Sequence, residues 1–428
     1  MSRIVPPAGP PRVLALAQLA NSLGDGAFYA CSALFFTRIV GLSATRVGLA
    51  LTLGWATGML AGVPLGHLAD RWGPRRTTVL LSVATAATLS TFLVVRSFPL
   101  FLLVVCVYAC CQGGLTSGRQ ALLAGLVEAD QRTTVRAHLQ STLNGGLAIG
   151  AGLGGLALYF DARPAYLSVF AVDAASFLAA ALVLRRLPEV PPAPVAAAGE
   201  PRLAVLRDRP YAVITFLNAI MYLNMPLLSL GLPLWIVQRT DAPKPMAAAL
   251  LVVNMLSVVV FQVRVARRVT DLRTAARVTG RAGWLMLAAC AVYALSGARI
   301  GAWPAVAILL AAAAIQVFGE MMQGAGGWEL SFALAPADKQ GQYQGFYGMA
   351  PQIARMLGPM LLTSLLIGWG MPGWLTLGGL FLLAGLAMGP AVRLAERRAG
   401  SGFDVDPRSG VRAPGPGPPV VKASPRLR

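Results

Sequence analysis

Five charged side chains lie inside long apolar runs of the chain: Asp25, Arg119, Asp173, Glu320 and Arg355. An ionised group at the centre of a membrane-spanning helix costs about 2.5–3.5 kcal/mol on insertion scales. Groups retained at that cost are candidates for carrying a proton, binding a charged solute or pairing with each other. We predict that Asp25 carries a proton, because protonation removes the cost of burying its charge. Structural pairing with Arg119 is the alternative, and Asp173 is expected to be structural.

Helical spacing places further polar residues beside these charges. Asn21 and Asp25 are four residues apart and share a helix face, and Gln316 shares a face with Glu320 in the same way. Glu320 suits a cationic solute, whereas Arg119 could bias the proton affinity of Asp25 or hold an anionic solute. Four more residues complete the predicted cavity, although each could instead be a packing residue: Phe28, Tyr29, Asn218 and Tyr222.

The apolar runs that hold these residues are long enough to cross a membrane. Of the 428 residues, 56% are hydrophobic and 12% are charged, whereas an average soluble domain is about a quarter charged. A bilayer core requires ~20 apolar residues per helical crossing, and backbone in lipid must satisfy its own hydrogen bonds. We therefore predict an all-α membrane protein with twelve transmembrane helices, at residues 13–38, 46–67, 77–96, 99–126, 138–160, 164–187, 211–236, 246–266, 275–297, 302–328, 343–367 and 373–395.

A linker divides these helices into two pseudo-symmetric halves of six. Residues 188–210 form the longest internal polar segment, and their Pro and Ala content is typical of a linker. A weak internal repeat lays Asn21 over Asn218, in agreement with this division. Two similar halves around a midplane site suit alternating access. The predicted domains are a six-helix bundle at 1–187, a cytoplasmic linker at 188–210, a second bundle at 211–395 and a disordered basic cytoplasmic tail at 396–428.

The net charge of +19 is spread over short loops and the tail. This placement argues against nucleic-acid binding and favours contact with anionic lipid headgroups. Lys and Arg concentrate on the side of the N-terminus, so the positive-inside rule predicts a multi-pass plasma-membrane protein with both termini cytoplasmic. The five cysteines and two histidines form no ligand cluster in the sequence, so we expect no metal site and no cofactor.

The loop between the second and third predicted helices carries a spaced motif. It resembles the G-x-x-x-D-R-x-G-x-R-R signature of the major facilitator superfamily and consists of Gly66, Asp70, Arg71, Gly73, Arg75 and Arg76. The resemblance implies a conformational latch that holds the two halves in an outward-facing state. In such a latch the Asp meets the cytosolic start of the eleventh helix, and the Arg meets an acid at the end of the fourth, here Glu128 or Asp130. The matching loop of the second half lacks the glycines and the Asp at this spacing.

A second resemblance lies in the fifth predicted helix. Its small residues resemble the G-x-x-x-G-P-x-x-G-G motif of the drug:proton antiporter branches of the superfamily, with Ala151 where that motif has proline; the matching glycines are Gly146, Gly150, Gly154 and Gly155. They would let the helix approach a partner from the other half closely. Ordinary small-residue packing is the alternative. The sequence Gly118-Arg119-Gln120 resembles the intramembrane arginine motif of the family.

These resemblances imply a monomeric secondary active transporter of a small molecule. Proton-coupled efflux of an amphipathic compound, by antiport and alternating access, is the leading hypothesis. A nutrient or metabolite symporter or facilitator is the second, and a membrane sensor that keeps the fold without transport is the third. An enzyme is not expected, because the sequence has no P-loop, GxSxG or HExxH motif.

Overall fold

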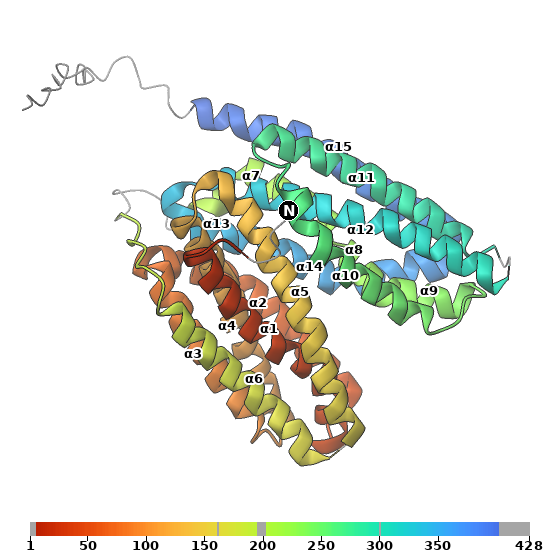
Figure 1. Ribbon diagram of the computed structural model, residues 1–428, viewed down its shortest axis with the longest axis horizontal. Helices are drawn as coiled ribbons and strands as arrows, with labels where there is room; N and C mark the ends of the chain where they lie inside the picture. The colour runs from red at the N-terminus through yellow and green to blue at the C-terminus, as the bar shows by residue number, and fades with distance from the viewer. Residues whose placement is uncertain (1–5, 161, 195–202, 299–300, 402–428) are drawn as a thin grey trace, which may run out of the picture.

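The regular elements of the computed structural model are helices in the part that it describes, residues 6–160, 162–194, 203–298 and 301–401. They form two groups of long rods (Figure 1). The first group comprises α1 (Pro10–Leu34) with its continuation η1 (Phe35–Ile39), α2 (Ala44–Trp72), α3 (Pro74–Phe92), α4 (Phe98–Leu126), α5 (Ala129–Phe160) and α6 (Arg163–Leu184). The second group follows the short η2 (Ala204–Arg207). Its first rod is built from α7 (Arg209–Met221), α8 (Asn224–Pro226), η3 (Leu227–Gly231) and α9 (Leu232–Arg239), and three single helices follow, α10 (Met246–Ala266), α11 (Leu272–Leu295) and α12 (Ala302–Ala333). The next rod is built from η4 (Ala337–Lys339), α13 (Gln340–Tyr347), α14 (Met349–Leu362) and η5 (Thr363–Trp369), and α15 (Met371–Ser401) is the last helix.

Ten rods in the described residues are long and apolar enough to cross a membrane. The α1 and α3 rods, which are more polar, complete the predicted twelve. In α3 the hydroxyl groups donate to carbonyl oxygens one turn earlier, as Thr78 Oγ1 does to Pro74 O at 2.6 Å and Ser82 Oγ to Thr78 O at 2.9 Å. The helix thus satisfies its own polar side chains, which is what a bilayer requires. The predicted all-α membrane architecture is confirmed.

Two helix boundaries differ from the prediction in ways that affect the site. The α2 helix continues to Trp72, so Asp70 lies in its last turn and not in a loop. It ends where Gly73 adopts a φ of 89°, a value that favours glycine, and Pro74 begins α3. The α5 helix begins at Ala129, well before the predicted start at 138, because its polar first turns continue the helix without a break.

The two halves meet at one end and diverge toward the other, so that the molecule has the shape of a V (Figure 1). At the meeting end α13 packs on α2 and α4, and α5 packs on α10 and α12. We call this the closed end and define it by Asp70. The opposite end, where α2 and α4 begin, is called the open end.

Apolar side chains of both halves form one continuous core at the closed end. This cluster joins Val63 and Leu123 of the first half to Val263 and Leu330 of the second, all of them buried. Toward the open end each half has its own core. Large apolar side chains on the outer surface are exposed, such as Leu383, which retains 66% of its accessible surface. A lipid environment accounts for that exposure.

The connecting segment packs against the closed end. Within the predicted linker at 188–210, η2 is helical and α7 begins at Arg209, while residues 195–202 lie outside the described residues. Ala193 N donates to Asp70 O at 2.8 Å, which fixes the linker to the end of α2. The α15 helix continues into the segment assigned to the tail, as far as Ser401, and residues 402–428 lie outside the described part.

Candidate functional site

A cavity of about 570 Å³ lies between the two halves. It begins above the closed end and reaches Val47 and Phe101, near the starts of α2 and α4. A volume of this size suits a small organic molecule. Six residues predicted to act in coupling or binding line it: Asp25, Phe28, Tyr29, Arg119, Tyr222 and Glu320.

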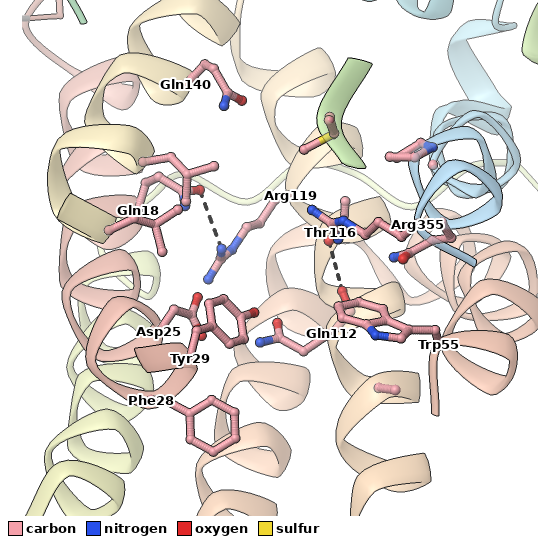
Figure 2. A pocket seen from close by; sticks show the side chains of 18 of the residues that line it. Gln18, Asp25, Phe28, Tyr29, Trp55, Gln112, Thr116, Arg119, Gln140 and Arg355 are labelled. Carbon is pink, nitrogen blue, oxygen red and sulfur yellow. Dashed lines mark hydrogen bonds between the residues drawn. The ribbon is translucent and has the colours of Figure 1, made fainter. Parts of the chain in front are cut away.

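Asp25 and Arg119 face each other across the wall formed by α1 and α4 (Figure 2). They form no ion pair within 4 Å, and Oδ1 of Asp25 is buried without a hydrogen-bond partner among the described residues. Arg119 Nη1 donates instead to Gln18 Oε1 at 3.5 Å. Asn21, with its amide oriented to suit both neighbours, accepts from Arg119 Nη2 and donates to Ser176 O. Arg119 is therefore held by neutral amides. Its charge and the Tyr108 hydroxyl still act on the Asp25 carboxyl group, whose Oδ1 is left available to a proton.

Glu320 faces the same cavity from the second half. Its Oε2 accepts a hydrogen bond from Asn254 Nδ2 at 2.8 Å. Phe28 contributes an edge of the wall but is mainly a packing residue, because its ring lies 5.2 Å from that of Phe170 and 5.8 Å from that of Tyr108. Tyr29, by contrast, is half exposed to the cavity.

Three of the predicted cavity residues do not line it. Asn21 is fully buried between α1, α4 and α6. Asn218 is also fully buried and accepts from Gln323 Nε2 at 2.8 Å, and Gln316 accepts from the Tyr293 hydroxyl at 2.8 Å inside the second half. Side chains four residues apart point in directions that differ by a small rotation about the helix axis. This rotation is enough to turn Gln316 into the bundle while Glu320 faces the cavity.

Several polar residues of the lining are absent from the predicted cavity. Gln112, Gln262 and Gln352 are amides inside apolar runs, a signal as strong as the one that identified Gln316. Arg355 was identified only as an intramembrane charge. Arg136 lies just outside the predicted helix at 138–160, because α5 begins earlier than predicted.

Asp173 lies outside the cavity, fully buried between α6 and α1. Ser176 Oγ donates to its Oδ1 at 3.3 Å. The backbone of Gly24 approaches so closely that a Cβ at that position would overlap the Asp173 carboxyl group. Oδ2 of Asp173, like Oδ1 of Asp25, is buried without a hydrogen-bond partner among the described residues. Asp173 differs from Asp25 in that it does not line the cavity, and its structural role stays a prediction.

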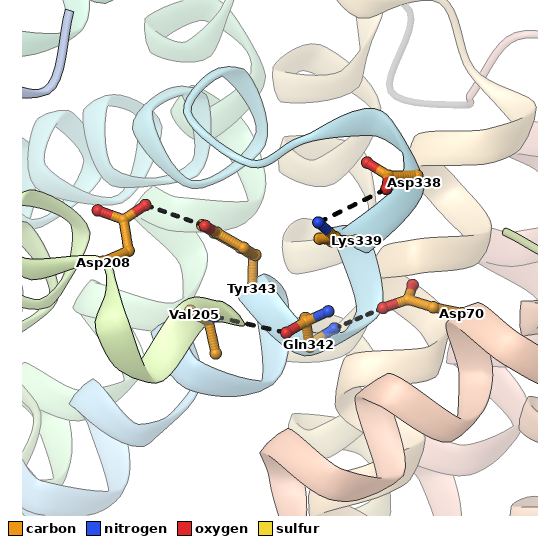
Figure 3. Close-up of polar contacts among 7 residues, drawn as sticks. All are labelled: Asp70, Val205, Asp208, Asp338, Lys339, Gln342 and Tyr343. Carbon is orange, nitrogen blue, oxygen red and sulfur yellow. Dashed lines mark hydrogen bonds and ion pairs between the residues drawn. The ribbon is translucent and has the colours of Figure 1, made fainter. Parts of the chain in front are cut away.

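At the closed end, Asp70 links the halves through the start of α13. Its Oδ1 accepts from Gly341 N at 2.6 Å and its Oδ2 accepts from Gln342 N at 2.9 Å (Figure 3). A carboxylate at a helix N-terminus satisfies unpaired N–H groups and complements the helix dipole. Tyr343 OH donates to Asp208 Oδ2 at 2.9 Å, so the start of α7 joins the same network. This is the contact that the family motif implies for its Asp.

The arginines of the motif make a different contact from the expected one. Arg75 Nη1 lies 3.4 Å from Glu189 Oε1 in the linker. Glu128 and Asp130 are exposed, as are Arg71 and Arg76, and no ion pair joins either acid to these arginines in the described part of the chain. The linker acid thus takes the place expected for an acid at the end of α4.

Glycines allow α2 and α13 to cross at backbone contact. A Cβ on Gly66 would overlap Gly341 O, and one on Gly345 would overlap Gly62 O.

We predict that Gly66→Ala destabilises the closed end by about 1–3 kcal/mol, the usual cost of overpacking, and slows transport accordingly. Gly48→Ala on the same helix is the control, because a Cβ there meets nothing within 4 Å. Initial transport rates in proteoliposomes check this, and equal rates for the two variants would contradict it.

The glycines of α5 pack against α1 of the same half. The prediction that they contact a helix of the other half is wrong. A Cβ on Gly146 would overlap Ser22, one on Gly150 would overlap Leu23 O, and one on Gly154 would contact Ala27. Gly155 faces open space. The glycine spacing correctly indicated a close helix contact, but spacing alone does not identify the partner helix.

A second set of contacts joins the halves at the closed end. Thr133 Oγ1 donates to Glu329 Oε2 at 2.5 Å, between α5 and α12. The Arg136 guanidinium lies 5.2 Å from the centre of the Trp328 ring. The contacts between α5 and α12 differ in chemistry from those between α2 and α13, so two unlike sets of contacts join the halves at the closed end.

Comparisons with known proteins agree with this architecture. A family model described as Major Facilitator Superfamily matches residues 14–359. No curated protein matches the chain. Among solved structures, the human organic anion transporter MFSD10 (TETRAN) is 18% identical with a TM-score of 0.66, covering 89% of this chain and 99% of its own. A bacterial homologue of the iron transporter ferroportin in an outward-facing state is 16% identical, with a TM-score of 0.71 and coverage of 92% and 100%.

A further similar structure is the transporter FucP in an outward conformation, which is 14% identical with a TM-score of 0.68 and coverage of 90% and 98%. At these identities the structures show a shared fold alone. The family model spans most of the chain, and the cavity between two six-helix halves is the arrangement that transport by alternating access requires. The chain therefore belongs to the Major Facilitator Superfamily and is a multi-pass membrane protein that acts as a secondary transporter of a small molecule, not as an enzyme.

Proposed function

We propose that this transporter couples the movement of a small amphipathic compound to protons and that Asp25 is the group that carries the proton. The observation that supports this most directly is the position of Asp25. It lies in the wall of the cavity, near Arg119 but without an ion pair to it. A carboxyl group in that position gains or loses a proton without breaking a salt bridge.

Protonation of Asp25 changes the charge that the cavity presents. The titratable or charged groups that act on it are Tyr29 on its own helix, Arg119 and Tyr108 on α4, and Asp173 on α6. When Asp25 takes up a proton, the charge of Arg119 is no longer offset by a nearby carboxylate. A membrane potential supplies ~2.3 kcal/mol per charge per 100 mV to such a cycle.

We place the closed end at the cytoplasm of the plasma membrane, because the loops there carry most of the Lys and Arg residues. The cavity then opens outward, and Asp70 acts as the conformational latch of that state. Rocking of the halves about the cavity would break the α2–α13 and α5–α12 contacts and close the open end.

Two directions of transport are compatible with this cycle. Export in exchange for protons is favoured by the resemblance of α5 to the antiporter motif, although its glycines pack within one half. Uptake together with protons is the second candidate, and it is favoured by the positive charge of the cavity lining.

Substrate-driven proton movement tests the proposal. Proteoliposomes that hold a pH-sensitive dye would be given members of a panel of amphipathic compounds. We expect transported compounds to change the internal pH, with alkalinisation marking proton exit and acidification marking proton entry. Transport of a compound with no pH change in either direction, at any applied potential, would contradict proton coupling.

A further inference from the structure

The charged groups that line the cavity are unequal in number. Three of them are guanidinium groups, on Arg119, Arg136 and Arg355, and two are carboxyl groups, on Asp25 and Glu320. Arginine stays protonated in proteins. The lining is therefore positive whether the two acids are ionised or neutral, and it becomes more positive when they take up protons.

None of the three arginines forms an ion pair with a carboxylate in the described residues. Arg119 is held by the neutral side chains of Asn21 and Gln18. Glu320 is engaged by Asn254. The guanidinium groups thus retain N–H donors for a ligand, and a guanidinium presents them in a fork that matches carboxylate and sulfonate oxygens.

The other two arginines lie against tryptophans of the opposite half. Arg136 of the first half lies 5.2 Å from the ring centre of Trp328 in the second. Arg355 of the second half lies 5.2 Å from the ring centre of Trp55 in the first. Figure 2 shows both side chains. These two reciprocal Arg–Trp pairs hold both guanidinium groups in the cavity wall, where neither has a carboxylate partner among the described residues.

Toward the open end the lining becomes aromatic and aliphatic. Phe36, Phe92 and Phe101 belong to it, together with Val47 and Leu51. The cavity therefore combines a cationic region with an apolar region, so its chemistry matches a molecule that has an anionic group and an apolar body.

We infer that the substrate is an amphipathic organic anion, whose carboxylate or sulfonate group binds among Arg119, Arg136 and Arg355. This inference rests on the proposed function in one respect, that the cavity between the halves is the transport site.

An anionic substrate also fixes the sign of coupling between substrate and proton. Each proton taken up by Asp25 or Glu320 strengthens the attraction for an anion, so proton and anion bind cooperatively and move in the same direction.

The test uses a matched pair of probes with one aromatic body, 2-naphthalenesulfonate and trimethyl(2-naphthyl)ammonium. Binding of each to the purified full chain in lipid nanodiscs would be measured by calorimetry. We expect the sulfonate to bind and the ammonium compound to bind at least about tenfold more weakly. Arg136→Gln and Arg355→Gln are each expected to weaken sulfonate binding by about tenfold to a hundredfold, the loss associated with a hydrogen bond to a charged group.

Two control variants separate charge from folding. Arg277→Gln removes an exposed arginine of α11 that lies outside the cavity, and it is expected to leave sulfonate binding unchanged. Arg355→Lys keeps the charge and is expected to retain the preference for the sulfonate while binding it less tightly. Melting temperatures confirm that each variant is folded.

The outcomes distinguish the inference from the proposed function. Equal or tighter binding of the ammonium probe, absence of sulfonate binding at millimolar concentration, or unchanged binding in both Arg→Gln variants would overturn the inference. Sulfonate binding that depends on the arginines, without proton movement in proteoliposomes, supports the assignment of an anionic substrate and contradicts both proton coupling and the sign of coupling derived from it. Proton movement driven by the ammonium probe would support proton coupling and contradict the assignment of an anionic substrate.

Discussion

Asp25→Asn is expected to reduce gradient-driven transport to the level of protein-free liposomes, while exchange of substrate for substrate continues. Asparagine has nearly the shape of a protonated aspartate, so the cavity keeps its form. It cannot take up or release a proton, and the cycle loses the group through which the proton gradient acts. Coupled transport and exchange are measured in the same proteoliposomes, with and without an imposed pH gradient.

Asp173→Asn is the matched control for this prediction. Asp173 is also a carboxyl group buried beside α1, but it lies outside the cavity, and asparagine still accepts the hydrogen bond from Ser176. It should retain gradient-driven transport. If Asp173→Asn loses coupling and Asp25→Asn keeps it, the proton carrier has been assigned to the wrong residue.

Asp70→Asn is expected to weaken the closed end by about 2–3 kcal/mol, which is roughly a hundredfold change in the ratio of the two orientations. The carboxylate accepts from Gly341 N and Gln342 N at the same time, and the amide has only one oxygen to offer them. The transporter would then spend more time open toward the Asp70 side, and net transport would fall.

Chemical accessibility reports this change directly. A cysteine in place of Gln140, in a variant without native cysteines, lies in the cavity near its closed end. Its reaction with a membrane-impermeant thiol reagent, applied from the Asp70 side, should accelerate in Asp70→Asn. Asp130→Asn, which alters an exposed acid at the same end, serves as control. Equal reaction rates in all three backgrounds would show that Asp70 is not a latch.

Sequence patterns identified the features that depend on composition and local spacing. Long apolar runs predicted the membrane-spanning helices, and the motif around Asp70 led to a carboxylate that meets the start of α13. Intramembrane charges led to Asp25 and Arg119 in the cavity wall. In each case the cost of placing a polar group in lipid makes the pattern informative.

Features that depend on how helices rotate and pair could not be read in this way. Asn21 and Gln316 share a turn with cavity residues but point into the bundle. The glycines of α5 indicated a close contact without indicating that α1 is the partner. Arg136 was missed for a different reason, because a helix that begins with polar turns resembles a loop in the sequence.

The exchange between the two arrangements of the halves is tested most directly by distances between spin labels at both ends. One pair of labels would be placed at Thr45 and Ser364 at the open end, and a second at Arg76 and Ala337 at the closed end, all on exposed positions. In Asp70→Asn we predict that the open-end distance shortens while the closed-end distance lengthens. Distances that stay unchanged, or that shift at one end alone, would contradict a rocking of two halves about the cavity.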